Sequence, residues 1–127
     1  MSGEQGWSGE RLLETVNHLD ADGWAGVEQR ARSLASVWGL WQPIITLQVL
    51  LGPAGSDYAF DAVLRASGEG QSAMATAERS GAGHVASYAV GQAAMAIKLA
   101  EKVAEFDPLL GPAAQAVLRP LLDMLEP

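Results

Sequence analysis

Apolar and small residues recur at helical spacing along most of this chain, and the pattern is clearest between His84 and Phe106. This stretch contains no proline and carries two neighbouring apolar stripes, which lie one residue apart around a helix. A surface helix needs only one such stripe, so two stripes predict a helix that packs on two sides. We therefore expect residues 84–106 to form a long, alanine-rich central helix.

Three helical patterns precede the first strong break. Ser8 is suited to cap a helix over residues 8–19, since its side chain can accept a hydrogen bond from the first turn. A second pattern runs over residues 24–41. Pro43 must end or kink that helix, and it suits the first turn of a short helix over residues 44–51.

Glycine and proline also punctuate the second half of the chain. The run Ser67-Gly68-Glu69-Gly70 is expected to break a helix that starts near Ser56, because glycine weakens a helix interior. Residues 71–79 would then form a separate short helix. A leucine-rich face over residues 109–126 predicts a final helix kinked at Pro120.

No stretch of the sequence alternates apolar and polar residues in the manner of a half-buried strand. The chain is therefore predicted to be all-α, a compact bundle of about five or six helices around the long central helix. At 127 residues it fits one domain by size, so residues 1–127 are expected to form a single helical domain after a loose lead-in over residues 1–7.

Composition adds a second expectation, which concerns partners. Charged residues make up 18% of the chain, below the roughly 25% of an average soluble domain. So thinly charged a chain favours an oligomer or a complex, in which part of the surface is covered. The net charge of −7, with only eight basic residues, argues against direct nucleic-acid binding, which needs clustered Lys and Arg.

Candidate chemistry is sparse. The chain has no cysteine, which excludes disulfides and thiolate metal sites, and it has no nucleophile elbow or phosphate-binding loop. Glu14 and His18 stand four apart on one helix, but a metal site would need further ligands from elsewhere. We therefore expect no enzyme activity, no cofactor and no metal. The polar, acidic start MSGEQGWSGE is unlike a signal peptide, which predicts a cytoplasmic protein.

Two uncharged runs allow a membrane alternative. Residues 33–56 and 80–97 lack charge, so a membrane-inserted helical hairpin is one interpretation. Pro43 and Pro53 interrupt the first run, and the second is mostly Ala, Gly and Ser, which contribute little to partition into hydrocarbon. These interruptions favour buried or interfacial helices over membrane spans.

Tryptophans suggest a further alternative. Trp24, Trp38 and Trp41 share one face of the second helical pattern. Such rings can fill a core, provide a partner hot spot or line a pocket, because tryptophan is enriched in all three settings. The alternative to association is therefore a helical pocket, between the tryptophan face and the alanine face, that binds an apolar small molecule.

The tripeptide Trp24-Ala25-Gly26 resembles the W-x-G turn of the small helical-hairpin proteins that type VII secretion systems export. The resemblance implies a turn between two antiparallel helices at this point. It covers three residues, and the family's Y-x-x-x-D/E export signal is missing, since Tyr58 is followed four later by Ala62 and Tyr88 by Gln92.

Together these patterns favour a non-enzymatic module that works by protein–protein association, either as a homo-oligomer or as a subunit of a larger assembly. Its partner would be a second copy or another protein. The large apolar side chains of the second pattern and of the leucine-rich tail are the expected interface anchors. They are Trp38, Trp41, Leu121, Leu122 and Leu125.

Overall fold

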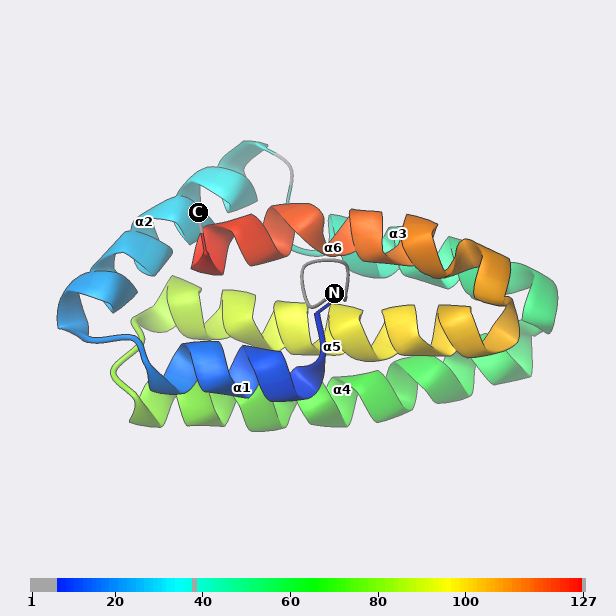
Figure 1. The fold of residues 1–127 in the computed structure, drawn as a ribbon, viewed down its shortest axis with the longest axis horizontal. Coiled ribbons are helices and arrows are strands. Elements are labelled where there is room, and N and C mark those ends of the chain that lie inside the picture. Colours follow the sequence, from blue (N-terminus) through cyan, green and yellow to red (C-terminus); the bar gives the residue numbers. More distant parts are fainter. Residues whose placement is uncertain (1–6, 38, 127) are drawn as a thin grey trace, which may run out of the picture.

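The computed structural model describes residues 7–37 and 39–126, and these residues form helices and no β-strand. The α-helices are α1 (Gly9–Asn17), α2 (Ala21–Val37), α3 (Gln42–Leu51), α4 (Ser56–Arg79), α5 (His84–Phe106) and α6 (Gly111–Leu125) (Figure 1). Two short 3₁₀ helices, η2 (Gly52–Ala54) and η3 (Pro108–Leu110), precede α4 and α6. The predicted all-α helical bundle is confirmed.

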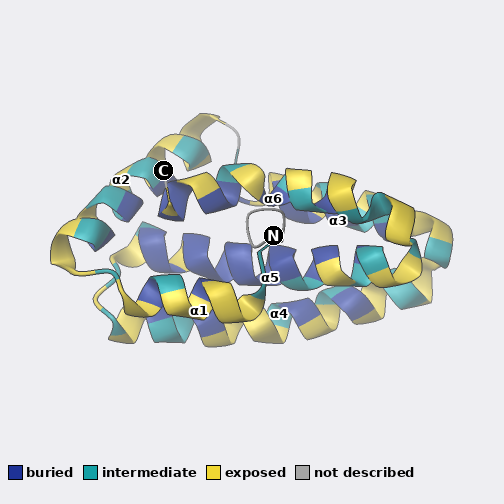
Figure 2. Ribbon diagram, in the orientation of Figure 1, coloured by how far each residue is buried: buried dark blue, intermediate teal, exposed yellow. Residues whose placement is uncertain are grey.

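Helix α5 has the bounds that its double apolar stripe predicts, and it contacts each of the other five α-helices. In Figure 1, α4 runs alongside α5 on one side and α6 on the other, while α1 covers the near face and α3 lies on the far side. Helix α2 crosses one end of the bundle at an angle. Figure 2 shows the consequence, since α5 is mostly buried whereas α2, α3 and α6 each keep an exposed side.

Helix α4 differs from the prediction, because it continues unbroken through Gly68 and Gly70. Gly70 is buried where α4 meets α5, and a Cβ atom added there would lie 2.9 Å from the backbone oxygen of Gly91. A Cβ atom added at Gly91 would in turn lie 3.0 Å from the backbone oxygen of Gly70. The expected break at Gly70 was wrong because this glycine allows a close helix–helix contact.

Small side chains extend this contact along α4. Its buried positions recur every three or four residues and are occupied only by alanine and glycine: Ala62, Ala66, Gly70, Ala73 and Ala77. A face of this kind lets two helix backbones approach more closely than leucines would permit. Helices α4 and α5 therefore form a closely packed pair, and the other helices pack against this pair.

The first two helices begin at hydrogen-bonding caps. The Ser8 hydroxyl accepts a hydrogen bond from the Arg11 N–H at 3.2 Å, which confirms the predicted cap. Helix α2 starts at Ala21, three residues before the predicted position, and the Asp20 carboxylate accepts from the Gly23 N–H at 2.8 Å. Trp24-Ala25-Gly26 thus lies inside α2 rather than in a turn.

The C-terminal end of the second pattern also differs from the prediction. Helix α2 ends at Val37, and Gly39 has a positive φ of 88°, a conformation that favours glycine after a helix. The Gly39 N–H donates to the carbonyl of Leu34 at 3.1 Å and closes the helix. Trp24 and Trp41 therefore belong to different segments: Trp24 is buried in α2, whereas Trp41 precedes α3.

Helix α2 holds the start of α5 through Glu28. Its carboxylate accepts hydrogen bonds from the backbone N–H of Ala86 at 2.7 Å and of Val85 at 3.4 Å, and it pairs with Arg32 at 3.0 Å. These are N–H groups of the first turn of α5, which has no side-chain cap of its own. A carboxylate here also faces the positive end of the helix dipole.

Helix α2 also contacts the end of α6. The Nε of Arg30 donates to the backbone oxygen of Met124 at 2.8 Å, which satisfies a carbonyl of the last turn of α6. A guanidinium at a helix C-terminus faces the negative end of the dipole. Glu28 thus contacts the N-terminus of α5 and Arg30 contacts the C-terminus of α6, each with the charge that the helix dipole favours.

The Glu28 contact predicts a pH-dependent contribution to stability. Burial raises the pKa of this carboxyl, but the hydrogen bonds from Ala86 and Val85 and the charge of Arg32 lower it by more, so the pKa lies below its ordinary value. Because the folded pKa is lower than the unfolded one, the contribution is present above about pH 4.3 and is lost as the pH falls through the folded pKa.

We therefore expect Glu28→Gln to lower the free energy of unfolding by about 1 kcal/mol at neutral pH, the usual value of a helix cap. The difference between wild type and variant should shrink at a second, acidic pH below the ordinary range of the carboxyl, because the wild-type group becomes protonated as the pH falls through its folded pKa. Urea unfolding at the two pH values measures both quantities. Glu14→Gln on the exposed face of α1 is the control, and an equal effect from it would contradict the capping role.

Candidate functional site

The structure places the five predicted interface anchors in different environments. Leu121, Leu122 and Leu125 are buried in the hydrophobic core, with Leu121 fully inaccessible. In this structure all three side chains pack inside one chain and present almost no surface to a partner, so their interface role stays an untested prediction. Trp41 remains 49% exposed, and Trp38 lies outside the described residues.

An exposed apolar stripe follows the outer face of α3. Trp41, Ile45 and Val49 are spaced four apart, and they are 49%, 49% and 69% exposed. The Ile45 N–H donates to the Trp41 carbonyl at 3.1 Å, so Trp41 continues the helical geometry and lies on the same face. The opposite face of α3 is buried in the bundle through Pro43, Ile44, Leu47 and Leu51.

Sequence reasoning missed Ile45 and Val49 as surface residues. The signal was present, because α3 carries large apolar residues on more than one side, and such a helix is normally covered by protein on more than one side. In this chain only one side is covered. We define the α3 stripe as Trp41, Ile45 and Val49.

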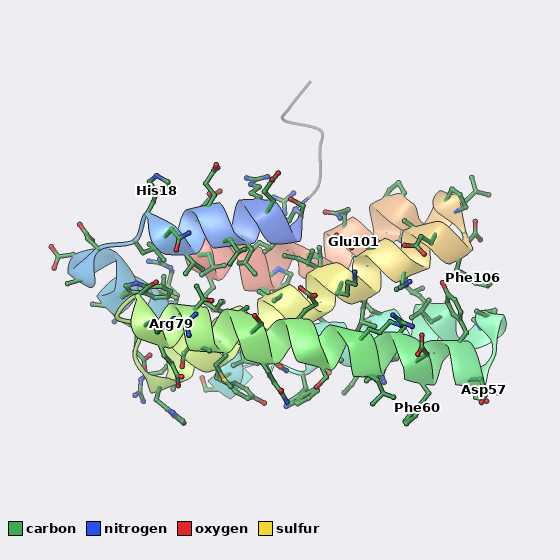
Figure 3. All side chains as sticks on the ribbon, turned by 90° about the horizontal axis from the view of Figure 1, so that it is seen from below. His18, Asp57, Phe60, Arg79, Glu101 and Phe106 are labelled. Carbon is green, nitrogen blue, oxygen red and sulfur yellow. The ribbon has the colours of Figure 1, made fainter. Side chains whose placement is uncertain are left out.

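The surroundings of the α3 stripe carry no charge in the sequence. Residues 33–56 contain no Asp, Glu, Lys or Arg, although the chain as a whole has a net charge of −7. A second pair of exposed apolar residues, Phe60 and Leu64 on α4, lies in a charged setting by comparison. The ion pair between Asp61 and Arg65, at 2.8 Å, lies beside them, and Figure 3 shows Phe60 pointing away from the bundle.

A groove lies on the other side of the molecule, between α1, α4 and α5. It encloses about 470 Å³ and is lined by residues from the first turns of α1 and the middle of the α4–α5 pair. Its lining combines apolar side chains with Glu10, Glu69, Lys98 and Glu101. Among the described residues no tryptophan lines this groove, so it differs from the tryptophan-lined pocket that the sequence suggested.

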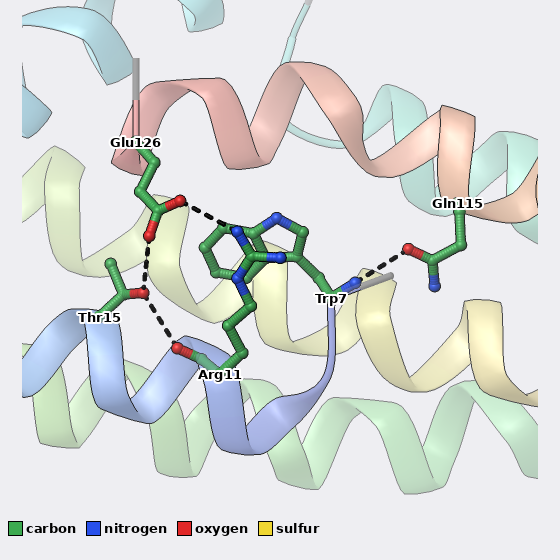
Figure 4. Close-up of polar contacts among 5 residues, drawn as sticks. All are labelled: Trp7, Arg11, Thr15, Gln115 and Glu126. Atoms are coloured by element: carbon green, nitrogen blue, oxygen red, sulfur yellow. Dashed lines mark hydrogen bonds and ion pairs between the residues drawn. The ribbon is translucent and has the colours of Figure 1, made fainter. Parts of the chain in front are cut away.

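A second hollow lies between α1 and the end of α6, and Figure 4 shows polar contacts between the segments that border it. The Arg11 guanidinium bonds the Glu126 carboxylate at 3.1 Å and lies 4.1 Å from the centre of the Trp7 ring. The backbone N–H of Trp7 donates to the side-chain oxygen of Gln115 at 3.0 Å, and the Thr15 hydroxyl donates to the Glu126 carboxylate at 3.4 Å. These contacts hold α1 against α6.

The histidines form no cluster in the part of the chain that the structure describes. His18 Nδ1 lies 2.7 Å from the backbone oxygen of Glu14, rather than beside its carboxylate. No group of three or more His, Asp or Glu side chains in residues 7–37 and 39–126 is placed to hold a metal ion.

Within the described residues no single helix is long and apolar enough to cross a membrane. Helices α2 and α3, together with η2, satisfy the length and composition only as a pair, bent by 63° across a break that includes residue 38.

Comparison with protein-family models, with curated proteins and with solved structures gives no match to this chain.

Proposed function

We propose that this chain is a non-enzymatic protein–protein association module whose copies pair through the α3 stripe. The observation that supports this most directly is the exposure of Trp41, Ile45 and Val49 on one helical face, opposite a face that is fully packed. Exposed apolar surface of this kind is typical of interaction sites, and a large aromatic ring often provides the dominant contact.

Electrostatics favours a second copy as the partner at this place. Two chains with a net charge of −7 repel each other, and at physiological salt the repulsion is strong only for charges within about 8 Å. Because residues 33–56 carry no charge, α3 itself brings no carboxylate of either copy into the interface.

The geometry of the stripe suits a two-fold arrangement. Eight residues of helix separate Trp41 from Val49, a rise of about 12 Å, which is enough for two helix turns to pack against their equivalents. In such a dimer the same patch is used on both copies, so the tryptophan of one copy lies against the aliphatic side chains of the other. The same surface would serve in a larger assembly.

The test is the double variant Ile45→Glu with Val49→Glu. Four carboxylates would then face one another across the two-fold axis, and we expect the dissociation constant to rise by about 100-fold or more. Light scattering behind a sizing column at two protein concentrations, without detergent, measures the change. Circular dichroism should show unchanged helicity, because both side chains are half-exposed or more.

The matched control is Phe60→Glu with Leu64→Glu, which places the same charges on exposed apolar positions of α4. Association should survive this change. A wild-type chain that is monomeric at every concentration would refute the proposal, and so would dissociation by the α4 control alone.

A further inference from the structure

Gln92 is a polar side chain in the buried middle of α5. This helix is mostly buried (Figure 2), and Gln92 is only 5% exposed. Ser87 is the other buried polar side chain among the described residues, and its hydroxyl donates to the carbonyl of His84 in the same helix. A buried amide costs free energy unless its hydrogen bonds are made, so we looked for the partner of Gln92 outside α5.

The amide of Gln92 reaches the connection between α2 and α3. Its Nε2 donates to the backbone oxygen of Leu40 at 3.5 Å. Among the described residues no backbone N–H bonds this oxygen, so the Gln92 amide is the partner that satisfies it. The bond is longer than most, but both residues are buried, and a hydrogen bond inside a protein is stronger than the same bond in water.

The bonded oxygen belongs to the peptide unit between Leu40 and Trp41. Because a peptide unit is planar, a hydrogen bond to its carbonyl also restrains the N–H and the Cα of Trp41. Trp41 makes no side-chain cap with α3. The direction of its Cα–Cβ bond is therefore set by this peptide unit and by the bond from the Ile45 N–H to the Trp41 carbonyl.

We infer that Gln92 is a positioning residue for the pairing surface, because it holds the peptide unit before Trp41 and so keeps the ring on the face of Ile45 and Val49. The inference rests on the proposed pairing through the α3 stripe. A ring that is already held in its bound orientation loses less conformational entropy on association, which makes the pairing tighter. Without the amide, the buried side chain of Leu40 alone ties this peptide unit to the core.

The test removes the donor with Gln92→Met, since methionine is similar in length, fits apolar surroundings and carries no N–H group. Helicity should be retained. We expect the dissociation constant of the pair to rise about tenfold, on the scale of the cost of immobilising one large side chain. Light scattering over a range of protein concentrations measures it.

Val103→Ala is the matched control. Val103 is also buried in α5 but lies three turns further along the helix, about 16 Å from Gln92. This variant should lower the free energy of unfolding and leave the dissociation constant within about twofold of wild type. An equal rise in the dissociation constant would show that any loss of stability weakens pairing, and it would overturn the inference.

A double-mutant cycle shows whether Gln92 acts through Trp41. Trp41→Ala removes the ring, so Gln92→Met added to it should raise the dissociation constant no further. A residue that only supported the fold would weaken pairing in both backgrounds alike. Additive effects of the two substitutions would therefore overturn the inference.

A further measurement does not depend on pairing. The backbone N–H of Trp41 belongs to the peptide unit that Gln92 bonds, so its NMR order parameter should be about 0.85 in wild type, as in rigid backbone, and below about 0.6 in Gln92→Met. An unchanged order parameter would overturn the inference even if the wild-type chain pairs. A wild-type chain that is monomeric at every concentration would instead refute the pairing, and with it any role of Gln92 in pairing.

Discussion

Replacing Gly70 by leucine is expected to destabilise the fold strongly, whereas the same replacement at Gly68, two residues earlier on α4, should stabilise it slightly. A Cβ atom at position 70 would lie 2.9 Å from the backbone oxygen of Gly91, and a backbone atom cannot move aside without displacing α5. No atom lies within 4 Å of the corresponding Cβ position at Gly68. The same substitution is therefore expected to destabilise the fold at position 70 and to stabilise it at position 68.

We expect Gly70→Leu to lower the free energy of unfolding by about 3 kcal/mol or more, the upper range for an overpacked core. Gly68→Leu should raise it by about 0.5–1 kcal/mol, because leucine has the higher helix propensity. Chemical denaturation of the two variants measures both values. A small or favourable effect at Gly70 would show that the two backbones do not approach as closely as described.

Replacing Leu121 by aspartate is expected to unfold the chain rather than dissociate an assembly. Leu121 has no accessible surface, so the variant loses apolar packing worth about 2–5 kcal/mol. Its carboxylate would in addition be buried without a hydrogen-bonding partner, which costs further free energy. Together these costs approach the whole stability of a typical domain, about 5–15 kcal/mol. Circular dichroism should show loss of helicity at neutral pH.

Leu109→Asp provides the control for this change. Leu109 lies in η3 just before α6 and is 88% exposed, so the same substitution should alter the free energy of unfolding by no more than about 0.5 kcal/mol. If Leu121→Asp instead gave a folded monomer from a wild-type oligomer, the assignment of the α6 leucines to the core would be wrong.

The helices were predictable wherever a local signal determined them. The proline-free double stripe gave α5 its correct bounds, and the Ser8 cap marked the start of α1. Gly70 misled the prediction because glycine has two uses, ending a helix and admitting a neighbouring backbone. Only the position of α5 distinguishes the two, and that position is tertiary information.

The same limit explains the interface residues. Periodicity shows that the α6 leucines and the α3 stripe each form an apolar face, but it does not say which face the rest of the chain covers. In the structure Leu122 is covered and Val49 is exposed. Glu28 was equally hidden from sequence reasoning, since its partner Ala86 lies 58 residues further along the chain.

The glycine contact between α4 and α5 also bears on how the chain folds. These two helices are consecutive, and residues 80–83 alone connect them, so bringing them together closes only a short loop. Closing a short loop costs little chain entropy, and pairs of this kind tend to form early. The Glu28 and Arg30 contacts of α2 span far longer stretches of sequence. A nascent chain therefore cannot form its closest helix contact before Gly91 has been synthesised, and the contact of Arg30 with Met124 becomes possible only near the end of synthesis.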